Sequence, residues 1–262
     1  MTKKKLEQAI VHCLRNGHKA FIPYIMAGDG GLDQLKDRIL FLQNAGATAI
    51  ELGVPFSDPV ADGPTIQQAG ERALQNGATL LNILAKLEEF YEEVDVPLVL
   101  MTYFNPLLSY GLSNFAEDGE RLGIAGIIVP DVPYEESDVL REALKETDLA
   151  IVPLISLTSA KERIAKIVRA GEGFIYAVTV NGITGAREEM NKDLDEHLHT
   201  IKELSNLPVM VGFGISTPEH VEKMNGMADG VIVGSAIVEA FREQDLSLIS
   251  SLINASKNKV IS

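Results

Sequence analysis

The chain has 262 residues and a formal net charge of −14 at pH 7, which disfavours nucleic acids and anionic membrane surfaces as partners because both are polyanions. Hydrophobic residues make up 46% and charged residues 23%, so we expect a folded chain, organised as a single domain over residues 1–262. The single cysteine, Cys13, cannot form an internal disulfide, and neither a signal-peptide pattern nor an apolar run of about 20 residues is visible, so we expect a cytoplasmic protein.

Eight short runs rich in Ile and Val carry no alternating polar face, which is typical of parallel strands that are buried on both sides. In chain order the predicted strands are Ala20–Met26, Thr48–Leu52, Val96–Met101, Ala125–Val129, Ala150–Ile155, Phe174–Val178, Pro208–Val211 and Gly230–Val233. Helical spacing occurs between them, for example in Thr79–Val94. Ser159 and Glu162 have the spacing of a capping box, and Thr217 before Pro218 predicts a second helix start.

Eight strands that alternate with helices predict an α/β fold of the (β/α)₈ TIM-barrel type. The alternative is a doubly wound open sheet, although the turn after the first predicted strand, Met26–Gly31, lacks the G-x-G-x-x-G pattern of that fold. An extra helix at Leu6–Asn16 could cover the barrel floor. Extra short helices are expected in the loops, including one at Thr65–Asn76 after the long segment Pro55–Pro64.

Two carboxylates follow the second predicted strand. Glu51 lies among Ile50, Leu52 and Val54, at the strand end where barrel enzymes place their sites. If it points into the barrel mouth, burial raises its pKa and makes it a candidate proton donor and acceptor; the alternative is a salt bridge to a neighbouring strand end.

Asp62 lies in the proline-rich loop that follows Glu51 along the chain. Three prolines restrict this loop, and Gly63 permits an unusual backbone dihedral. Asp58, beside Pro59, has the stronger case for being an ordinary turn residue. Asp62 is therefore the better candidate for a role in a site.

Glycine turns follow the last three predicted strands. They are Asn181–Gly185, Gly212–Ser216 and Gly234–Ala236, the last of which opens a short helix. Backbone N–H groups of such turns, together with a helix N-terminus, form a phosphate site, and barrels frequently build one after strands 7 and 8. The pattern indicates a small phosphorylated metabolite as substrate.

Aromatic and apolar residues near the same strand ends suggest a flat apolar group beside the phosphate, although each residue singly could belong to the core. They are Tyr24, Met101, Tyr103, Phe104, Tyr176 and Phe213. No lysine lies in or just after a predicted strand, which disfavours a Schiff base. His197 and His199 are two positions apart on a predicted helix and face different ways, so no metal site is expected.

The segment LGVPFSDPVADGPT from Leu52 to Thr65, preceded by Glu51, resembles the signature of the tryptophan synthase alpha subunit family. Further resemblance covers nearly the whole chain and includes Pro23–Asp29, Met101–Pro106, Pro130–Pro133, Gly212–Ser216 and Gly234–Ala236. The resemblance implies a TIM barrel that cleaves indole-3-glycerol phosphate to indole and glyceraldehyde 3-phosphate.

Residue roles follow from that resemblance. Glu51 is expected to act as general acid and base, and Asp62 to hydrogen-bond the indole N–H and stabilise positive charge. The expected phosphate ligands are Gly185, Gly214, Gly234 and Ser235, and the expected indole pocket is Tyr24, Met101, Tyr176 and Phe213. The loop at Asn181–Glu188 is expected to close, with Thr184 reaching the Asp62 loop.

The resemblance further implies a partner, a beta subunit that carries pyridoxal phosphate, in an alpha2-beta2 assembly. This chain itself needs no cofactor, and its partner interface is expected at Pro55, Asp58 and Pro59 and at the loop after the third predicted strand. Other readings remain open at this point: another phosphate-binding barrel such as an isomerase or epimerase, a docking module without catalysis, or a free-standing indole-releasing lyase.

Overall fold

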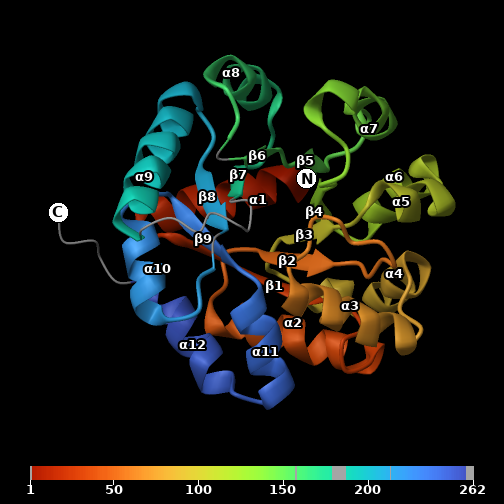
Figure 1. The fold of residues 1–262 in the computed structure, drawn as a ribbon. Coiled ribbons are helices and arrows are strands. Elements are labelled where there is room, and N and C mark those ends of the chain that lie inside the picture. The colour runs from red at the N-terminus through yellow and green to blue at the C-terminus, as the bar shows by residue number, and fades with distance from the viewer. Residues whose placement is uncertain (1, 157, 179–186, 213, 258–262) are drawn as a thin grey trace.

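The computed structural model describes residues 2–156, 158–178, 187–212 and 214–257. Its centre is an all-parallel sheet with the strand order β5-β4-β3-β2-β1-β9-β8-β7-β6 (Figure 1). The strands are β1 Ala20–Met26, β2 Ile50–Gly53, β3 Leu98–Met101, β4 Ile124–Ile128, β5 Ala150–Ile151, β6 Leu154–Ser156, β7 Ile175–Val178, β8 Val209–Gly212 and β9 Gly230–Val233.

The sheet closes into a barrel where β5 and β6 meet. These strands end the sheet order, yet only Val152 and Pro153 separate them along the chain. Val152 N donates to Ile127 O of β4 at 3.0 Å, and Tyr176 N of β7 donates to Pro153 O at 3.0 Å. The barrel prediction is confirmed, and the open-sheet alternative is wrong.

The fifth predicted strand differs from the prediction. The run Ala150–Ile155 forms two short strands rather than one, so the described chain has nine strands instead of eight. Pro153 explains the break because it has no N–H to offer a sheet ladder.

Helices surround the barrel, and the loops carry further short helices, as predicted (Figure 1). The helices are α1 Thr2–Arg15, α2 Leu35–Ala45, α3 Pro64–Gln75, α4 Leu80–Glu88, α5 Phe104–Tyr110, α6 Leu112–Arg121, α7 Asp138–Leu144, α8 Lys161–Ala170, α9 Arg187–Leu204, α10 Pro218–Asn225, α11 Ser235–Glu243 and α12 Leu246–Ala255. Single 3₁₀ turns occur at η1 Leu32–Gln34, η2 Tyr91–Glu93 and η3 Tyr134–Glu136. No helix within the described ranges is long and apolar enough to cross a membrane.

Two predicted helix starts have different outcomes. Thr217 caps α10, and its hydroxyl accepts a hydrogen bond from His220 N at 3.3 Å. The predicted capping box at Ser159 is wrong: α8 begins after Ala160, and no described residue hydrogen-bonds the Ser159 hydroxyl. Ser159 N donates to Ser156 O at 3.0 Å, and Ala160 rather than Ser159 takes the N-cap position.

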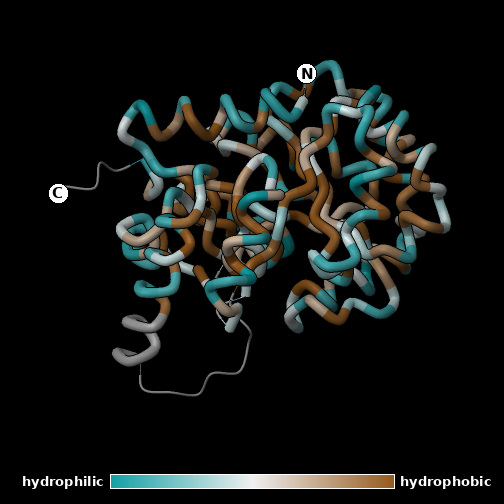
Figure 2. Tube along the Cα trace, turned by 90° about the horizontal axis from the view of Figure 1, so that it is seen from above, coloured by the Kyte–Doolittle hydropathy of each residue, from teal (hydrophilic) through white to brown (hydrophobic). Residues whose placement is uncertain are grey.

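Helix α1 covers one end of the barrel, as expected for the extra N-terminal helix. Leu6 and Ile10 are fully buried and belong to one core cluster with buried residues of the strands and of the positions next to them. These residues are Ala20, Ile22, Ala49, Val99, Ala125, Ile128, Ala150, Val152, Phe174, Met210 and Ile232. A second, larger core lies between the sheet and the helices, and hydrophilic segments face outward (Figure 2). The opposite end of the barrel remains free for a site.

Candidate active site

The carboxyl ends of the strands open into a cavity of about 830 Å³. It is lined by both predicted carboxylates, by three of the four predicted pocket residues and by three of the four predicted phosphate ligands. These are Glu51, Asp62, Tyr24, Met101, Tyr176, Gly214, Gly234 and Ser235. Phe213, Gly185 and Thr184 lie outside the described residues.

Glu51 is a buried carboxyl group on β2, where it pairs in register with Tyr24 of β1 and Val99 of β3. Its side chain lines the cavity, the residue is 3% exposed, and no described group hydrogen-bonds its Oε2 atom. Burial raises the pKa of Glu51 to about 8, and the negative charge of Asp62 adds to the increase. No cation contributes to this shift, so the salt-bridge alternative lacks support among the described residues.

Asp62 lies in the loop between β2 and α3, where neighbouring backbone groups hold it. Its N–H donates to Pro59 O at 3.1 Å, and Gln67 Nε2 donates to Asp62 O at 2.8 Å. Burial raises the pKa of the Asp62 carboxyl to about 6, while a hydrogen bond from the Tyr103 hydroxyl opposes the increase. At pH 7, therefore, Asp62 is mostly ionised and Glu51 is mostly protonated.

Tyr103 supports the Asp62 loop, a role that the sequence reasoning missed. The residue follows β3 and is 1% exposed, and its hydroxyl accepts a hydrogen bond from Ala61 N at 3.0 Å. The Phe56 ring lies against it, with 5.2 Å between ring centroids. Its place just after a strand was a usable signal, but its partner lies 41 positions away in sequence, and spacing alone does not pair the two.

Two tyrosine rings reach the carboxylates because glycines lie beneath them. A Cβ atom at Gly53 would lie 2.0 Å from Tyr24 Oη, and a Cβ atom at Gly212 would lie 2.6 Å from the Tyr176 ring. The pKa of both tyrosine hydroxyls is raised well above its usual range, first by burial and then by the charges of Glu51 and Asp62. Both rings line the cavity together with Glu51 and Asp62, and they give this part of the wall an apolar surface, which we call the apolar slot.

The other side of the cavity is built from backbone groups. Gly214 adopts φ +40°, a conformation that favours glycine, and Gly234 is the N-cap of α11. Ser235 begins this nine-residue helix, so the first N–H groups of α11 and its positive dipole end lie at the cavity wall. This arrangement suits a phosphate group.

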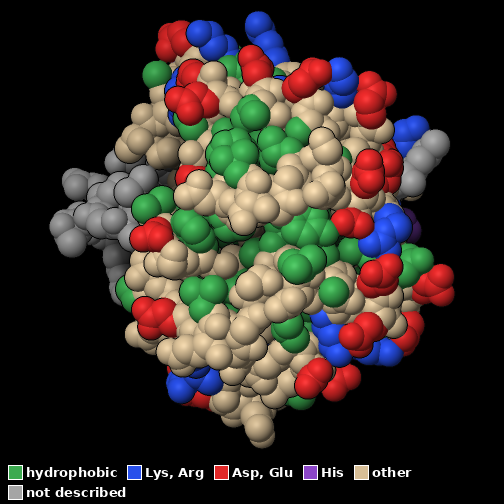
Figure 3. Space-filling view, turned by 90° about the vertical axis from the view of Figure 1, so that its right-hand side faces the viewer, with side chains coloured by type: hydrophobic (Ala, Val, Ile, Leu, Met, Phe, Trp, Pro, Cys, Tyr) green, Lys and Arg blue, Asp and Glu red, His purple; other side chains and the backbone are tan. Residues whose placement is uncertain are grey.

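The predicted interface residues lie beside the cavity on the side that carries α4, α5 and α6. Asp58 is exposed and accepts a hydrogen bond from Ser57 Oγ at 2.6 Å, Pro59 is half-buried, and Pro55 is buried. Pro55 lines a neighbouring groove of about 630 Å³ together with residues from α3–α6, among them Leu81 and Tyr110. Hydrophobic side chains form several patches on this face (Figure 3).

The described residues contain no cluster of three or more His, Cys, Asp or Glu side chains able to hold a metal ion. The chemistry that the described groups can supply is proton transfer between two carboxylates of different pKa, next to an apolar slot and an anion site.

The family model described as the tryptophan synthase alpha chain matches residues 10–260. Proteins named tryptophan synthase alpha chain from Bacillus cereus (strain ATCC 14579) and Bacillus thuringiensis subsp. konkukian are each 51% identical over 252 residues, which cover 96% of this chain and 98% of theirs.

Solved structures agree in fold. A Mycobacterium tuberculosis tryptophan synthase structure superposes with a TM-score of 0.89 at 35% identity, covering 97% of this chain and 98% of that chain. The tryptophan synthase alpha chain from Legionella pneumophila has a TM-score of 0.87 at 32% identity and covers 98% and 99%.

Proposed function

This chain belongs to the tryptophan synthase alpha chain family, and we propose that Glu51 and Asp62 carry out the alpha reaction of that family, the cleavage of indole-3-glycerol phosphate to indole and glyceraldehyde 3-phosphate. The observation that carries the proposal is a buried carboxyl group, Glu51, without a cationic partner among the described residues and close enough to Asp62 for their charges to interact. We further propose that residues 1–262 act as one domain, because β1 and β9 pair across most of the chain.

The proposed chemistry moves two protons and breaks one carbon–carbon bond. Glu51, protonated at neutral pH, donates a proton to indole C3, which makes a cationic indolenine. The glycerol hydroxyl then loses its proton and becomes the aldehyde, while the electrons of the breaking bond restore the indole ring. Glu51 takes up a proton in this second step, and the Asp62 carboxylate stabilises the positive charge through the indole N–H.

We propose that the glycine side of the cavity holds the substrate phosphate through Gly185, Gly214, Gly234 and Ser235. Backbone N–H groups at the start of α11 support this assignment for the last two residues. The indole ring would occupy the slot formed by Tyr24, Met101, Tyr176 and Phe213. Such a slot excludes water from the reacting carbon, as closure of a loop carrying Thr184 would also do.

We propose a beta subunit as partner, in an alpha2-beta2 complex, with pyridoxal phosphate on that subunit and none on this chain. The loop exposes Asp58, and the groove beside Pro55 adds apolar side chains such as Leu80 and Leu81, a mixed surface that a partner could cover. Indole could then pass to the partner without crossing bulk water. We propose a cytoplasmic location, as for other biosynthetic enzymes that work on soluble metabolites.

The test measures indole release from indole-3-glycerol phosphate by the purified chain, with and without a tryptophan synthase beta subunit. We expect slow release alone and a large increase with the partner. Glu51→Gln and Asp62→Asn should each lower kcat by about 10²–10⁴-fold. Fast release without the partner would indicate a free-standing lyase, and no release under either condition would contradict the proposed function.

A further inference from the structure

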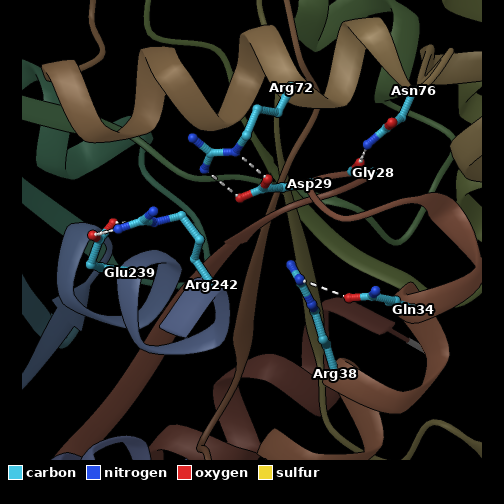
Figure 4. Close-up of polar contacts among 8 residues, drawn as sticks. All are labelled: Gly28, Asp29, Gln34, Arg38, Arg72, Asn76, Glu239 and Arg242. Atoms are coloured by element: carbon cyan, nitrogen blue, oxygen red, sulfur yellow. Dashed lines mark hydrogen bonds and ion pairs between the residues drawn. The ribbon is translucent and has the colours of Figure 1, made fainter. Parts of the chain in front are cut away.

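Helix α3 leads away from the Asp62 loop, and its second half is fastened to the turn that follows β1 (Figure 4). Arg72 Nε donates to Asp29 Oδ1 at 2.7 Å, and Arg72 Nη2 donates to Asp29 Oδ2 at 2.9 Å. One helical turn later, Asn76 Nδ2 donates to Gly28 O at 3.0 Å. We call these four residues, Gly28, Asp29, Arg72 and Asn76, the α3 anchor.

The α3 anchor is tightly packed as well as hydrogen-bonded. Gly28 adopts φ +87°, and a Cβ atom there would lie 2.5 Å from Ala78 Cβ and 3.5 Å from Ala73 Cβ. The backbone of the β1 turn therefore rests directly on the end of α3. The Asp29 side chain is 7% exposed and the Arg72 side chain 36%, so the carboxylate is buried while the guanidinium that pairs with it in a bidentate manner keeps partial contact with water.

Neighbouring arginines have partners of their own. Arg242 of α11 pairs with Glu239, and Arg38 of α2 donates to Gln34 Oε1 at 3.0 Å while its guanidinium lies over the Phe241 ring. In the part of the chain that is described, Arg72 supplies both hydrogen bonds to the Asp29 carboxylate. Loss of Arg72 would leave a buried carboxylate without a hydrogen-bond donor.

The first turn of α3 lies at the active site. Gly63, the N-cap of α3, directly follows Asp62, and Gln67 on the next turn donates to Asp62 O at 2.8 Å. Ile66 Cδ1 would lie 3.6 Å from a Cβ atom at Gly234, the glycine that caps α11. A twelve-residue helix, about 18 Å long, thus connects the α3 anchor with both the Asp62 loop and the glycine turn.

We propose that Arg72 is a positioning residue: its pair with Asp29 fixes the orientation of α3 and thereby holds Asp62 in place at the other end of the helix. The inference rests on the proposed role of Asp62. Neither Arg72 nor Asp29 lines the cavity, so we assign the contribution of the pair to the helix that connects it with Asp62. The effect belongs to kcat, because Asp62 acts on charge that develops during the reaction.

The kinetic test compares Arg72→Met, Arg72→Lys and Asp29→Asn with the matched control Arg121→Met, which removes a surface ion pair with Glu88 and Asp118. We expect Arg72→Met to lower kcat at least tenfold per folded molecule, with KM changed less than threefold, and Arg72→Lys to recover part of the loss. The Arg72→Met/Asp29→Asn double variant should be no slower than Arg72→Met alone. If Arg72→Met does not fold, the other two single variants carry the test.

Amide hydrogen exchange supplies a readout that does not depend on activity. Arg72→Met or Arg72→Lys should speed exchange in the segment 62–67, whereas Arg121→Met should leave it unchanged. Two results would overturn the positioning role of Arg72. One is unchanged exchange at residues 62–67 in the Arg72 variants. The other is an unchanged kcat in these variants although Asp62→Asn inactivates the enzyme. A wild-type chain that releases no indole would instead contradict the proposed function, and the exchange data would still decide whether the α3 anchor holds the Asp62 loop.

Discussion

Glu51 and Asp62 carry the same functional group in different surroundings. Glu51 lies on a strand among apolar side chains, and burial keeps it protonated at neutral pH. Asp62 lies on a loop where the Tyr103 hydroxyl stabilises the ionised form. One carboxyl can therefore donate a proton while the other holds a negative charge, the division that acid–base catalysis beside a developing cation requires.

The two pKa values predict the pH dependence of kcat/KM for indole-3-glycerol phosphate. The value should rise as Asp62 ionises near pH 6 and fall as Glu51 loses its proton near pH 8. Tyr103→Phe removes a hydrogen bond that lowers the pKa of Asp62, so the acidic limb should move to higher pH while the basic limb stays. Tyr91→Phe, at an exposed hydroxyl that donates to Glu92 outside the cavity and outside the groove beside Pro55, is the control. An unmoved acidic limb in Tyr103→Phe would contradict the assignment.

The raised pKa of Glu51 also makes the free energy of unfolding depend on pH. Because its pKa is raised in the folded state, the folded chain binds the proton more tightly than the unfolded chain, and stability falls as pH rises from about 4.5 through 8. Glu51→Gln carries no charge and should flatten this dependence, stabilising the fold by up to about 5 kcal/mol at pH 9 and much less at pH 5. Urea unfolding at both pH values measures the effect. Equal effects at the two pH values would show that Glu51 is not buried as a neutral acid.

Glu51 and Asp62 were predictable from sequence because both belong to one strand and the loop that follows it, a short-range pattern. The bonds from Tyr103 to Asp62 and from Arg72 to Asp29 were not predictable, since each joins residues about 40 positions apart. Their residue types are common in cores and on helix surfaces. Only the closed barrel brings these partners together.

At the scale of elements, neighbouring strands form the apolar slot jointly. The Tyr24 ring of β1 lies over Gly53 of β2, and the Tyr176 ring of β7 lies over Gly212 of β8. Each ring needs the adjacent strand to present bare backbone at one position. The position of each ring therefore depends on a glycine of the neighbouring strand. Gly53 and Gly212 leave room for the rings without contributing a side chain to the slot.

Gly53→Ala tests this dependence. The new Cβ atom would lie 2.0 Å from Tyr24 Oη, so the ring must move into the cavity, and KM for indole-3-glycerol phosphate should rise about tenfold, about 1.4 kcal/mol of binding. Gly70→Ala is the matched control, because its Cβ atom would meet only Met26 Cε, at an ordinary 3.5 Å. A KM for Gly53→Ala equal to that of the control would contradict the steric argument.

Element boundaries were predictable where a local signal decides them. Thr217 followed by proline predicts the start of α10, and Thr217 is the cap. Ser159 carried an equally good signal, yet α8 begins one residue later than it predicts, with Ala160 as the N-cap. The break at Pro153 was visible in the sequence as a proline, but the surrounding apolar run hid it. The apolar run 150–155 predicted a strand, but only the structure shows that this strand is interrupted at Val152 and Pro153.

At the scale of the molecule, the barrel has a closed end and an open end. Helix α1 closes one end, where Leu6 and Ile10 share a core cluster with buried residues of the strands, and the strand ends open into the cavity at the other. Stability and function are thus carried by opposite ends of the same strands.

Leu6→Ala should lower the free energy of unfolding by about 2–5 kcal/mol, because it leaves a void in a fully buried position. The kcat of the folded enzyme should be unchanged, since the substitution lies at the end opposite the cavity. Leu81→Ala, at a residue that is 60% exposed, should change stability by less than about 0.5 kcal/mol. Urea titration and a kinetic assay on the same preparations measure both quantities, and a loss of kcat in Leu6→Ala would refute the separation of the two ends.

The pairing of β1 with β9 has a consequence for synthesis of the chain. Ala20 pairs with Gly230, 210 positions later, whereas β1 can meet β2 almost at once. A ribosome adding about 5–20 residues per second needs about 10–40 s to make that stretch. Throughout that time one side of the first strand presents unpaired backbone groups, an edge that invites pairing with other chains. The nascent polypeptide is therefore most exposed to aggregation before its last strand emerges, and a message truncated before residue 230 would leave that edge permanently open.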